Sequence, residues 1–189
     1  MSTFEETLKG KARYKTKLRT VRLPISIDNS LEEEAAKRGI TMNSFVVSIL
    51  EKYGEWDRLA EKFRFIGFPL QMVREQYALI KDKAAIERAA RSSGATVPRE
   101  MMLFWFKEVS LESFLRYLAL QAKFQGYAEY ETSHHGENIV IVAKHQLGPN
   151  WSIWLGAYLE EAIKSNLGVV ARVECSDNTV KLEFAERYA

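Results

Sequence analysis

Two polar side chains on a short extended stretch, Thr20 and Arg22, have the types and spacing needed to form specific hydrogen bonds with donors and acceptors along one edge of a ligand. They alternate with Val21 and Leu23 in the run LRTVRLP at residues 18–24, which is the period-two pattern of a half-buried strand. An arginine donates two parallel hydrogen bonds, and a threonine supplies a hydroxyl and a methyl group. Pro24 ends the stretch because it has no N–H to donate to a sheet.

Positive charge is concentrated around this stretch. Residues 9–22 contain seven Lys or Arg and no acid, whereas the whole chain has 27 basic and 25 acidic residues. The rest of the chain therefore holds 20 basic and 25 acidic residues, a net charge of −5. A basic arm on an otherwise acidic chain is typical of polyanion binding, although a solvated, disordered tail would have the same composition.

Two short helices are expected after the strand. Apolar residues recur every four positions over Ser26–Lys37, and Gly39 is a good left-handed stop. Thr41 is an N-cap for a second helix that ends near Gly54. About forty residues with one strand cannot build an independent core, so we expect a dimer in which two strands pair across a twofold axis above four helices. Such a two-stranded ribbon fits the major groove of double-stranded DNA.

The pattern resembles the ribbon-helix-helix family. The matching residues are Thr20-Val21-Arg22-Leu23-Pro24, Gly39, and Thr41-Met42-Asn43-Ser44-Phe45-Val46, and the resemblance covers about residues 18–54. Glu34 departs from the family, which often has an apolar residue there, and Leu18 is unusual at an outward position.

The resemblance implies a homodimeric, sequence-specific transcriptional regulator, with dimers that can pair into tetramers. The base-facing residues would be Leu18, Thr20 and Arg22. The phosphate-binding residues would be Lys9, Lys11, Arg13, Lys15, Lys17, Thr41, Asn43 and Ser44. For Thr41, Asn43 and Ser44, plain capping of the helix explains the residue types equally well.

The fold class that we predict is mainly α with a C-terminal α+β domain. Residues 1–17 are expected to be a flexible basic arm, 18–55 the ribbon-helix-helix domain, 56–126 a helical region, and 127–189 an α+β domain of unknown role. Helices are predicted over 56–65, 70–81, 82–92, 99–108 and 111–125, with breaks at Gly67-Phe68-Pro69 and Ser92-Ser93-Gly94. The C-terminal domain is predicted as β-β-α-β-β, over 127–133, 138–145, 150–166, 169–175 and 179–184.

The C-terminal part leaves a metal- or ligand-responsive regulator as an alternative. It contains every His and Cys of the chain, namely His134, His135, His145 and Cys175, but none at close metal-binding spacing. We therefore predict no metal site and no cofactor. The stripe Trp151, Trp154, Leu155, Tyr158, Leu159, Ala162, Ile163 could line a pocket for a small-molecule effector, although such a stripe is more often core.

Other classes of protein fit the sequence less well. No Gly-rich phosphate loop, GxSxG or HExxH motif is present, so we do not expect an enzyme. No apolar run spans a membrane, the N-terminus has no secretory signal, and Cys175 is the sole cysteine, so a cytoplasmic protein is the simplest expectation. An antitoxin or a protein-interaction scaffold would share the N-terminal pattern, and a dimer without DNA affinity would distinguish the scaffold.

Overall fold

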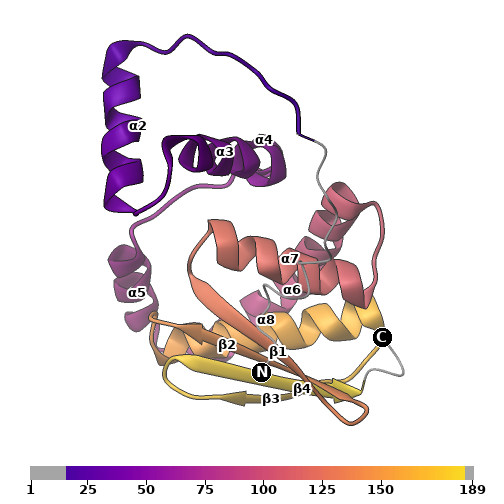
Figure 1. The fold of residues 1–189 in the computed structure, drawn as a ribbon. Coiled ribbons are helices and arrows are strands. Elements are labelled where there is room, and N and C mark those ends of the chain that lie inside the picture. Colours follow the sequence, from indigo (N-terminus) through magenta and orange to yellow (C-terminus); the bar gives the residue numbers. More distant parts are fainter. Residues whose placement is uncertain (1–15, 186–189) are drawn as a thin grey trace. The chain divides into compact units, whose positions relative to one another are not determined.

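The computed structural model describes residues 16–185, and these belong to two compact units (Figure 1). The described residues of the N-terminal unit are 16–65, and those of the C-terminal unit are 66–185. The described chain is mainly helical and contains one four-stranded antiparallel sheet near its C-terminus, which confirms the predicted fold class at that level. The division falls after Phe65, ten residues beyond the predicted end of the first domain, because Trp56 packs against Phe65 with ring centroids 5.4 Å apart.

The two predicted helices of the N-terminal unit are present. Helix α2 spans Ile25–Lys37 and α3 spans Met42–Lys52. Gly39 between them has a φ of +65°, a left-handed conformation that glycine adopts without a steric penalty. Residues 16–24 form no regular secondary structure in this single chain, so the predicted strand, which needs a partner, stays a prediction.

The chain does not form the separate helix predicted over residues 56–65. It continues from α3 through a π-helical turn at Tyr53–Asp57, the short helix α4 at Arg58–Ala60, and a 3₁₀ turn at Glu61–Phe63. Arg64 then takes a left-handed φ of 53° and reverses the chain. Burial of Trp56 holds this widened turn against the unit, and periodicity does not detect such packing.

Three helices open the C-terminal unit: α5 at Leu70–Ala78, α6 at Lys83–Phe106, and α7 at Leu111–Phe124. The predicted break at Ser92-Ser93-Gly94 was wrong, because α6 runs through it without interruption. Gly94 is buried against α8 rather than placed in a turn. Helix α7 begins with a capping box in which the Ser110 and Ser113 side chains satisfy each other's backbone amides.

The sheet follows and consists of two hairpins, the first with two eight-residue strands and the second with shorter strands. Strands β1 (Ala128–His135) and β2 (Asn138–His145) are joined at Gly136, and α8 (Pro149–Leu167) leads to β3 (Arg172–Cys175) and β4 (Thr179–Ala185). The spatial order is β1-β2-β4-β3, with every neighbouring pair antiparallel. Strand β3 is shorter than the predicted 169–175. Alternate residues of β4 are buried, namely Val180, Leu182 and Phe184, and α8 packs on β3 and β4.

The core of the C-terminal unit lies between this sheet and the helices. Helices α6 and α8 pack closely along their length, and the buried residues of α8 include Leu155, Tyr158, Leu159, Ala162 and Ile163. This confirms that most of the Trp151–Ile163 stripe is core. Among the described residues, no helix is long and apolar enough to cross a membrane.

Candidate nucleic-acid interface

The predicted base-reading residues lie together on an exposed segment. Leu18, Thr20 and Arg22 are all exposed, and Leu18 has 91% of its surface accessible. The residues expected to face inward, Val21 and Leu23, are also exposed, at 71% and 41%. Among the described residues this segment has neither a paired backbone nor a covered apolar face, so the predicted strand stays a prediction that needs a partner.

The basic arm is described only at its end. Lys9, Lys11, Arg13 and Lys15 lie outside the described residues. Lys17 is described and exposed. The structure therefore places one of the five arm cations next to the exposed segment.

The N-terminus of α3 is capped as the sequence predicts. The Ser44 N–H donates to Thr41 Oγ1 at 3.1 Å, and the two hydroxyl oxygens are 2.8 Å apart. Thr41, Asn43 and Ser44 are all exposed. Capping satisfies one of the free amides of the first turn, so other amides and the positive end of the helix dipole remain available to an anion.

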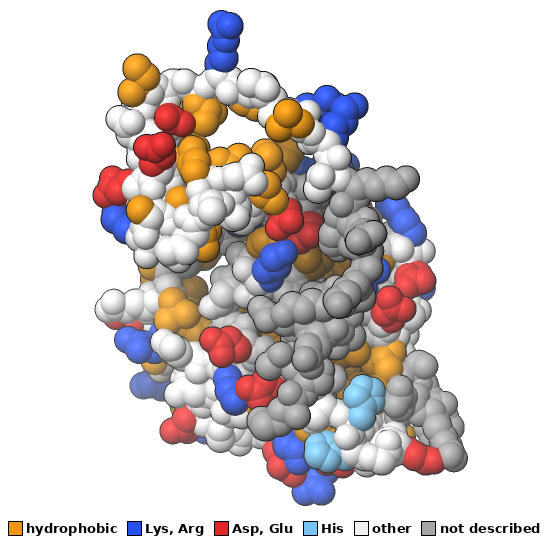
Figure 2. Space-filling model, viewed as in Figure 1, with side chains coloured by type: hydrophobic (Ala, Val, Ile, Leu, Met, Phe, Trp, Pro, Cys, Tyr) orange, Lys and Arg blue, Asp and Glu red, His pale blue; other side chains and the backbone are white. Residues whose placement is uncertain are grey.

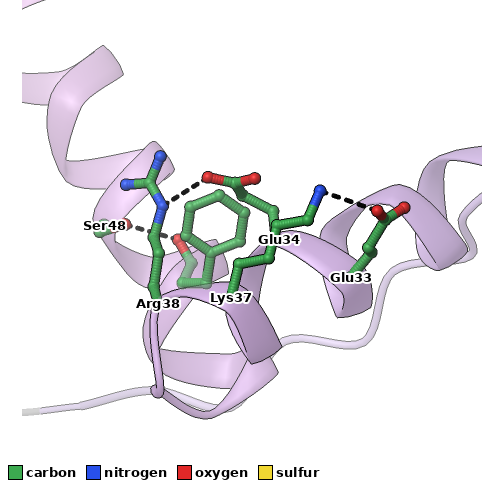
Figure 3. Close-up of polar contacts among 6 residues, drawn as sticks. Glu33, Glu34, Lys37, Arg38 and Ser48 are labelled. Atoms are coloured by element: carbon green, nitrogen blue, oxygen red, sulfur yellow. Dashed lines mark hydrogen bonds and ion pairs between the residues drawn. The ribbon is translucent and has the colours of Figure 1, made fainter.

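Glu34, the departure from the family pattern, makes a local contact of its own (Figure 3). Its Oε1 accepts a hydrogen bond of 2.7 Å from Arg38 Nε, and the Arg38 guanidinium lies 4.9 Å from the centroid of the Phe45 ring. Phe45 is the buried residue of α3. The acidic residue therefore holds an arginine over the aromatic ring that joins the helices. Sequence periodicity did not predict this contact, although the i,i+4 spacing of Glu34 and Arg38 is a detectable signal.

Large apolar side chains are exposed on the N-terminal unit, and on the face that Figure 2 shows, groups of hydrophobic atoms lie over the region of α2 and α3. The buried hydrophobic residues of this unit are Ala35, Phe45, Trp56 and Ala60. The exposed large hydrophobic residues of the segment and its two helices are Leu18, Val21, Leu23, Ile25, Ile27, Val47, Ile49 and Leu50. They include Val21 and Leu23, the residues expected to face inward on the predicted strand. A single copy of this unit leaves its own hydrophobic face uncovered.

The histidines and the cysteine do not gather into a metal site. No group of three metal-binding side chains occurs in residues 16–185. His134 and His135 are exposed at the end of β1, whereas His145 is buried on β2. The Leu147 N–H donates to His145 Nδ1 at 3.2 Å, and His145 Nε2 lies 2.9 Å from Ser152 Oγ. Both ring nitrogens are therefore engaged within the protein.

The His145–Ser152 pair also has the wrong polarity for nucleophile activation. Because Nδ1 accepts from a backbone amide, the ring proton lies on Nε2 and is donated to the serine hydroxyl. A general base would need a free lone pair at that nitrogen. The Ser152 hydroxyl in turn donates to the Asp177 carbonyl at 3.1 Å. These hydrogen bonds are suited to holding the connection between β2 and α8 in place, and they do not activate Ser152 as a nucleophile.

Sequence reasoning missed a buried network of tyrosines in the C-terminal unit. Tyr130 donates to Tyr127 at 3.4 Å, Tyr127 donates to Gln121, and Gln121 donates to Tyr117 at 2.6 Å. The Tyr117 and Tyr158 hydroxyls are 2.7 Å apart. Burial raises the pKa of Tyr117 to about 12, so the hydroxyls stay protonated and available for these bonds. The members come from α7, the residue before β1, β1 itself and α8, and no sequence spacing brings Tyr158 to the others.

Comparisons with known proteins leave the family assignment untested. No protein-family model matches the chain, and no curated protein is significantly similar to it.

Proposed function

We propose that the chain is a homodimeric, DNA-binding transcriptional regulator whose N-terminal unit pairs residues 18–24 with those of a second copy. The observation that carries this proposal is the uncovered state of that unit. Among the described residues its segment 18–24 is unpaired, α3 is capped by Thr41, and many of its large apolar residues face solvent. A second copy supplies both the missing strand and the missing half of the core.

The polar residues support DNA as the ligand of the resulting ribbon. Pairing about a twofold axis displays two copies of Thr20 and Arg22 on one face, at a width that the major groove accepts. The exposed N-terminus of α3 and the cation of Lys17 lie in the same unit and suit phosphate contacts. The residues Leu18, Thr20 and Arg22 would specify the sequence, and the arm would supply affinity that does not depend on sequence.

The two rival functions predict different behaviour. A scaffold that only dimerises through the ribbon would not bind DNA. An antitoxin would carry a short toxin-binding tail, whereas residues 66–185 include a sheet and helices with their own buried core. The C-terminal unit is better suited to sensing or assembly.

Fluorescence anisotropy of the full chain with mixed-sequence and selected duplex DNA tests the proposal. We expect binding at low salt that weakens steeply as salt rises, because arginine and lysine release counterions from phosphates. A Thr20→Ala/Arg22→Ala variant should lose sequence preference and keep part of its affinity. Arg19→Ala is the matched control for charge. It also removes one arginine, at the residue before Thr20, and should keep the sequence preference. Absence of binding at low salt would leave dimerisation as the role of the ribbon.

A further inference from the structure

Strand β3 is an outer strand of the sheet, with β4 on one side and no strand of the described residues on the other (Figure 1). The Ser176 N–H donates to the Thr179 carbonyl at 2.8 Å, which makes these two residues a hydrogen-bonded pair of the β3–β4 hairpin. Because such pairs recur at every second residue, Val173 directs its backbone N–H and C=O away from β4. No hydrogen bond within residues 16–185 engages these two groups, so β3 presents an open edge there.

The side chains of β3 alternate between an apolar and a charged face. A Cβ built at Gly156 of α8 would lie 3.2 Å from Val173 Cγ1 and 2.7 Å from Cys175 Sγ, so these two side chains face the helix. Arg172 and Glu174 therefore lie on the opposite face of the strand, where both are exposed. The Arg172 guanidinium is 3.0 Å from the Glu174 carboxylate. The edge thus carries opposite charges on either side of Val173.

Strand β4 continues this alternation of charge. In the register of the two strands, Arg172 lies opposite Glu183 and Glu174 lies opposite Lys181. Lys181 Nζ and Glu183 Oε2 are 3.7 Å apart. The four charges therefore alternate in sign both along the strands and between them. A further strand fits this edge best if it places an acid beside Arg172 and a base beside Glu174.

Strand β3 of a second copy meets that requirement. About a twofold axis through Val173 and perpendicular to the sheet, two β3 strands run antiparallel, and Arg172 of each copy lies opposite Glu174 of the other. An axis one residue earlier or later would place Arg172 opposite Arg172, or Glu174 opposite Glu174. Like charges directly opposite each other are destabilising. The charges of this edge are therefore self-complementary in the register centred on Val173.

We propose that β3 is a self-association edge, at which two copies of the chain pair their β3 strands antiparallel about Val173 and join their sheets. The charges select a second copy over an arbitrary strand, because a strand without the complementary pattern leaves Arg172 and Glu174 unpaired or repelled. The strand has only four residues and forms few hydrogen bonds. The contact is therefore weak, and it is not populated in solution at micromolar concentration.

Such a contact acts between molecules that are already held close together. On DNA it would join neighbouring dimers, a consequence that rests on the proposed function. Two dimers bound side by side on one duplex have a high effective concentration, and a weak contact between them then adds to the affinity of both. The β3 edge would thus make DNA binding cooperative.

Disulfide trapping of the full chain tests the register without DNA. Cys175→Ser removes the sole cysteine, and Arg172→Cys and Glu174→Cys are made in that background as two separate proteins. The two positions are directly opposite in the proposed pair, whereas two copies of the same position are diagonal and too far apart for an unstrained disulfide. At submillimolar concentration the mixture should cross-link at least about tenfold faster than either protein alone.

Strand β4 supplies the matched control. Lys181→Cys and Glu183→Cys, in the same Cys175→Ser background, replace one base and one acid at the same spacing and on the same face, one strand away from the edge. Their mixture should cross-link no faster than the separate proteins. Equal rates for the β3 mixture and the β4 mixture overturn the proposal.

Charge reversal tests the selection of a second copy. Sedimentation of the wild type should show larger species as its concentration rises from micromolar to submillimolar. Arg172→Glu and Glu174→Arg should each weaken this association roughly fivefold to tenfold, because like charges then lie opposite each other twice. A mixture of the two variants restores both opposite-charge pairs and should associate as the wild type does. Mixing does not repair a damaged fold, so failure of the mixture to associate overturns the proposal, as does wild-type sedimentation that is constant over this range.

Fluorescence anisotropy with a mixed-sequence duplex long enough for two dimers tests the consequence on DNA. Wild type should bind this duplex with a steeper titration curve than Arg172→Glu. Curves of equal steepness beside intact β3 cross-linking overturn the cooperative role and retain the self-association edge. Absence of DNA binding beside intact cross-linking would instead count against the proposed function.

Discussion

Gly94 on α6 lies directly against the backbone of Tyr158 on α8. A Cβ built at Gly94 would clash with the Tyr158 carbonyl oxygen and lie 3.1 Å from the carbonyl carbon. Backbone atoms cannot rotate away as a flexible side chain can. The close approach of the two longest described helices therefore depends on a residue without a side chain.

Gly94→Ala should destabilise the C-terminal unit. Overpacking of this kind costs about 1–3 kcal/mol, against a gain of about 1 kcal/mol in helix propensity, and the rigid contact places the net effect on the destabilising side. Urea unfolding followed by tryptophan fluorescence measures it, because three of the four tryptophans lie in this unit. Ser92→Ala, on an exposed position of the same helix, should be neutral or slightly stabilising. Equal stability of Gly94→Ala and wild type would contradict the close approach.

Gly94 also shows what the sequence can and cannot predict. Ser92-Ser93-Gly94 has the composition of a turn, and only the partner helix explains why the glycine is helical. In contrast, Gly39 was predicted as the stop of the first helix, and it has a positive φ because that conformation is local. A local signal therefore predicted this helix end, whereas the course of α6 depends on packing between distant residues that the sequence does not reveal.

The candidate sites likewise divide into contacts between residues close in sequence, which were predicted, and contacts between distant residues, which were not. The Thr41 cap is a contact between residues three apart, and the sequence predicted it. The tyrosine network joins Tyr117 to Tyr158 across 41 positions, and an edge-on ring contact joins Tyr77 to Trp151 across more than seventy. Such contacts depend on tertiary packing, which has no periodic signature in one sequence. The predicted ribbon is a further contact that one chain cannot show, because its strand would pair with a strand of a second chain.

The uncovered apolar residues predict a dimer that a single charge disrupts. Full-length protein should sediment at twice its 21.8 kDa chain mass at micromolar concentration. Leu50→Asp, at a residue 63% exposed in one copy, should shift it toward monomer, because a carboxylate would be buried without a partner at the interface. Val170→Asp is the matched control, since Val170 is 78% exposed in the other unit and should not affect assembly. A monomeric wild type would remove the basis of the proposed ribbon.

Thr41 offers a way to separate helix capping from phosphate binding. Thr41→Asn and Thr41→Asp both keep a side-chain oxygen for the Ser44 amide, so their unfolding free energies should lie within about 1 kcal/mol of wild type. If a phosphate binds at this helix end, Thr41→Asp should lower DNA affinity at least about tenfold through charge repulsion, while Thr41→Asn should not. Anisotropy titrations at one fixed salt concentration provide the comparison. Equal affinities would assign Thr41 to capping alone.

Burial of His145 predicts that stability falls on acidification. Burial lowers the pKa of His145 below its ordinary value of 6.5, so the folded state resists the proton that the unfolded state accepts. Well above pH 6.5 the ring is neutral in both states and contributes no pH dependence. As the pH falls through 6.5, the unfolded state binds more protons and the free energy of unfolding decreases, until the pH passes the lowered pKa of the folded state. A second ring proton would also have to point at the Leu147 N–H, which now donates to Nδ1.

Urea unfolding at a series of pH values between 5 and 8 measures this effect. His145→Gln removes the titrating ring and should flatten the loss of stability below pH 6.5, even if its stability at pH 8 is lower than that of wild type. His135→Gln, at an exposed position on the hairpin, should keep the wild-type slope. Wild-type and His145→Gln curves that run parallel from pH 8 to 5 would show that His145 accepts its proton equally in both states, and the buried neutral ring would have to be abandoned.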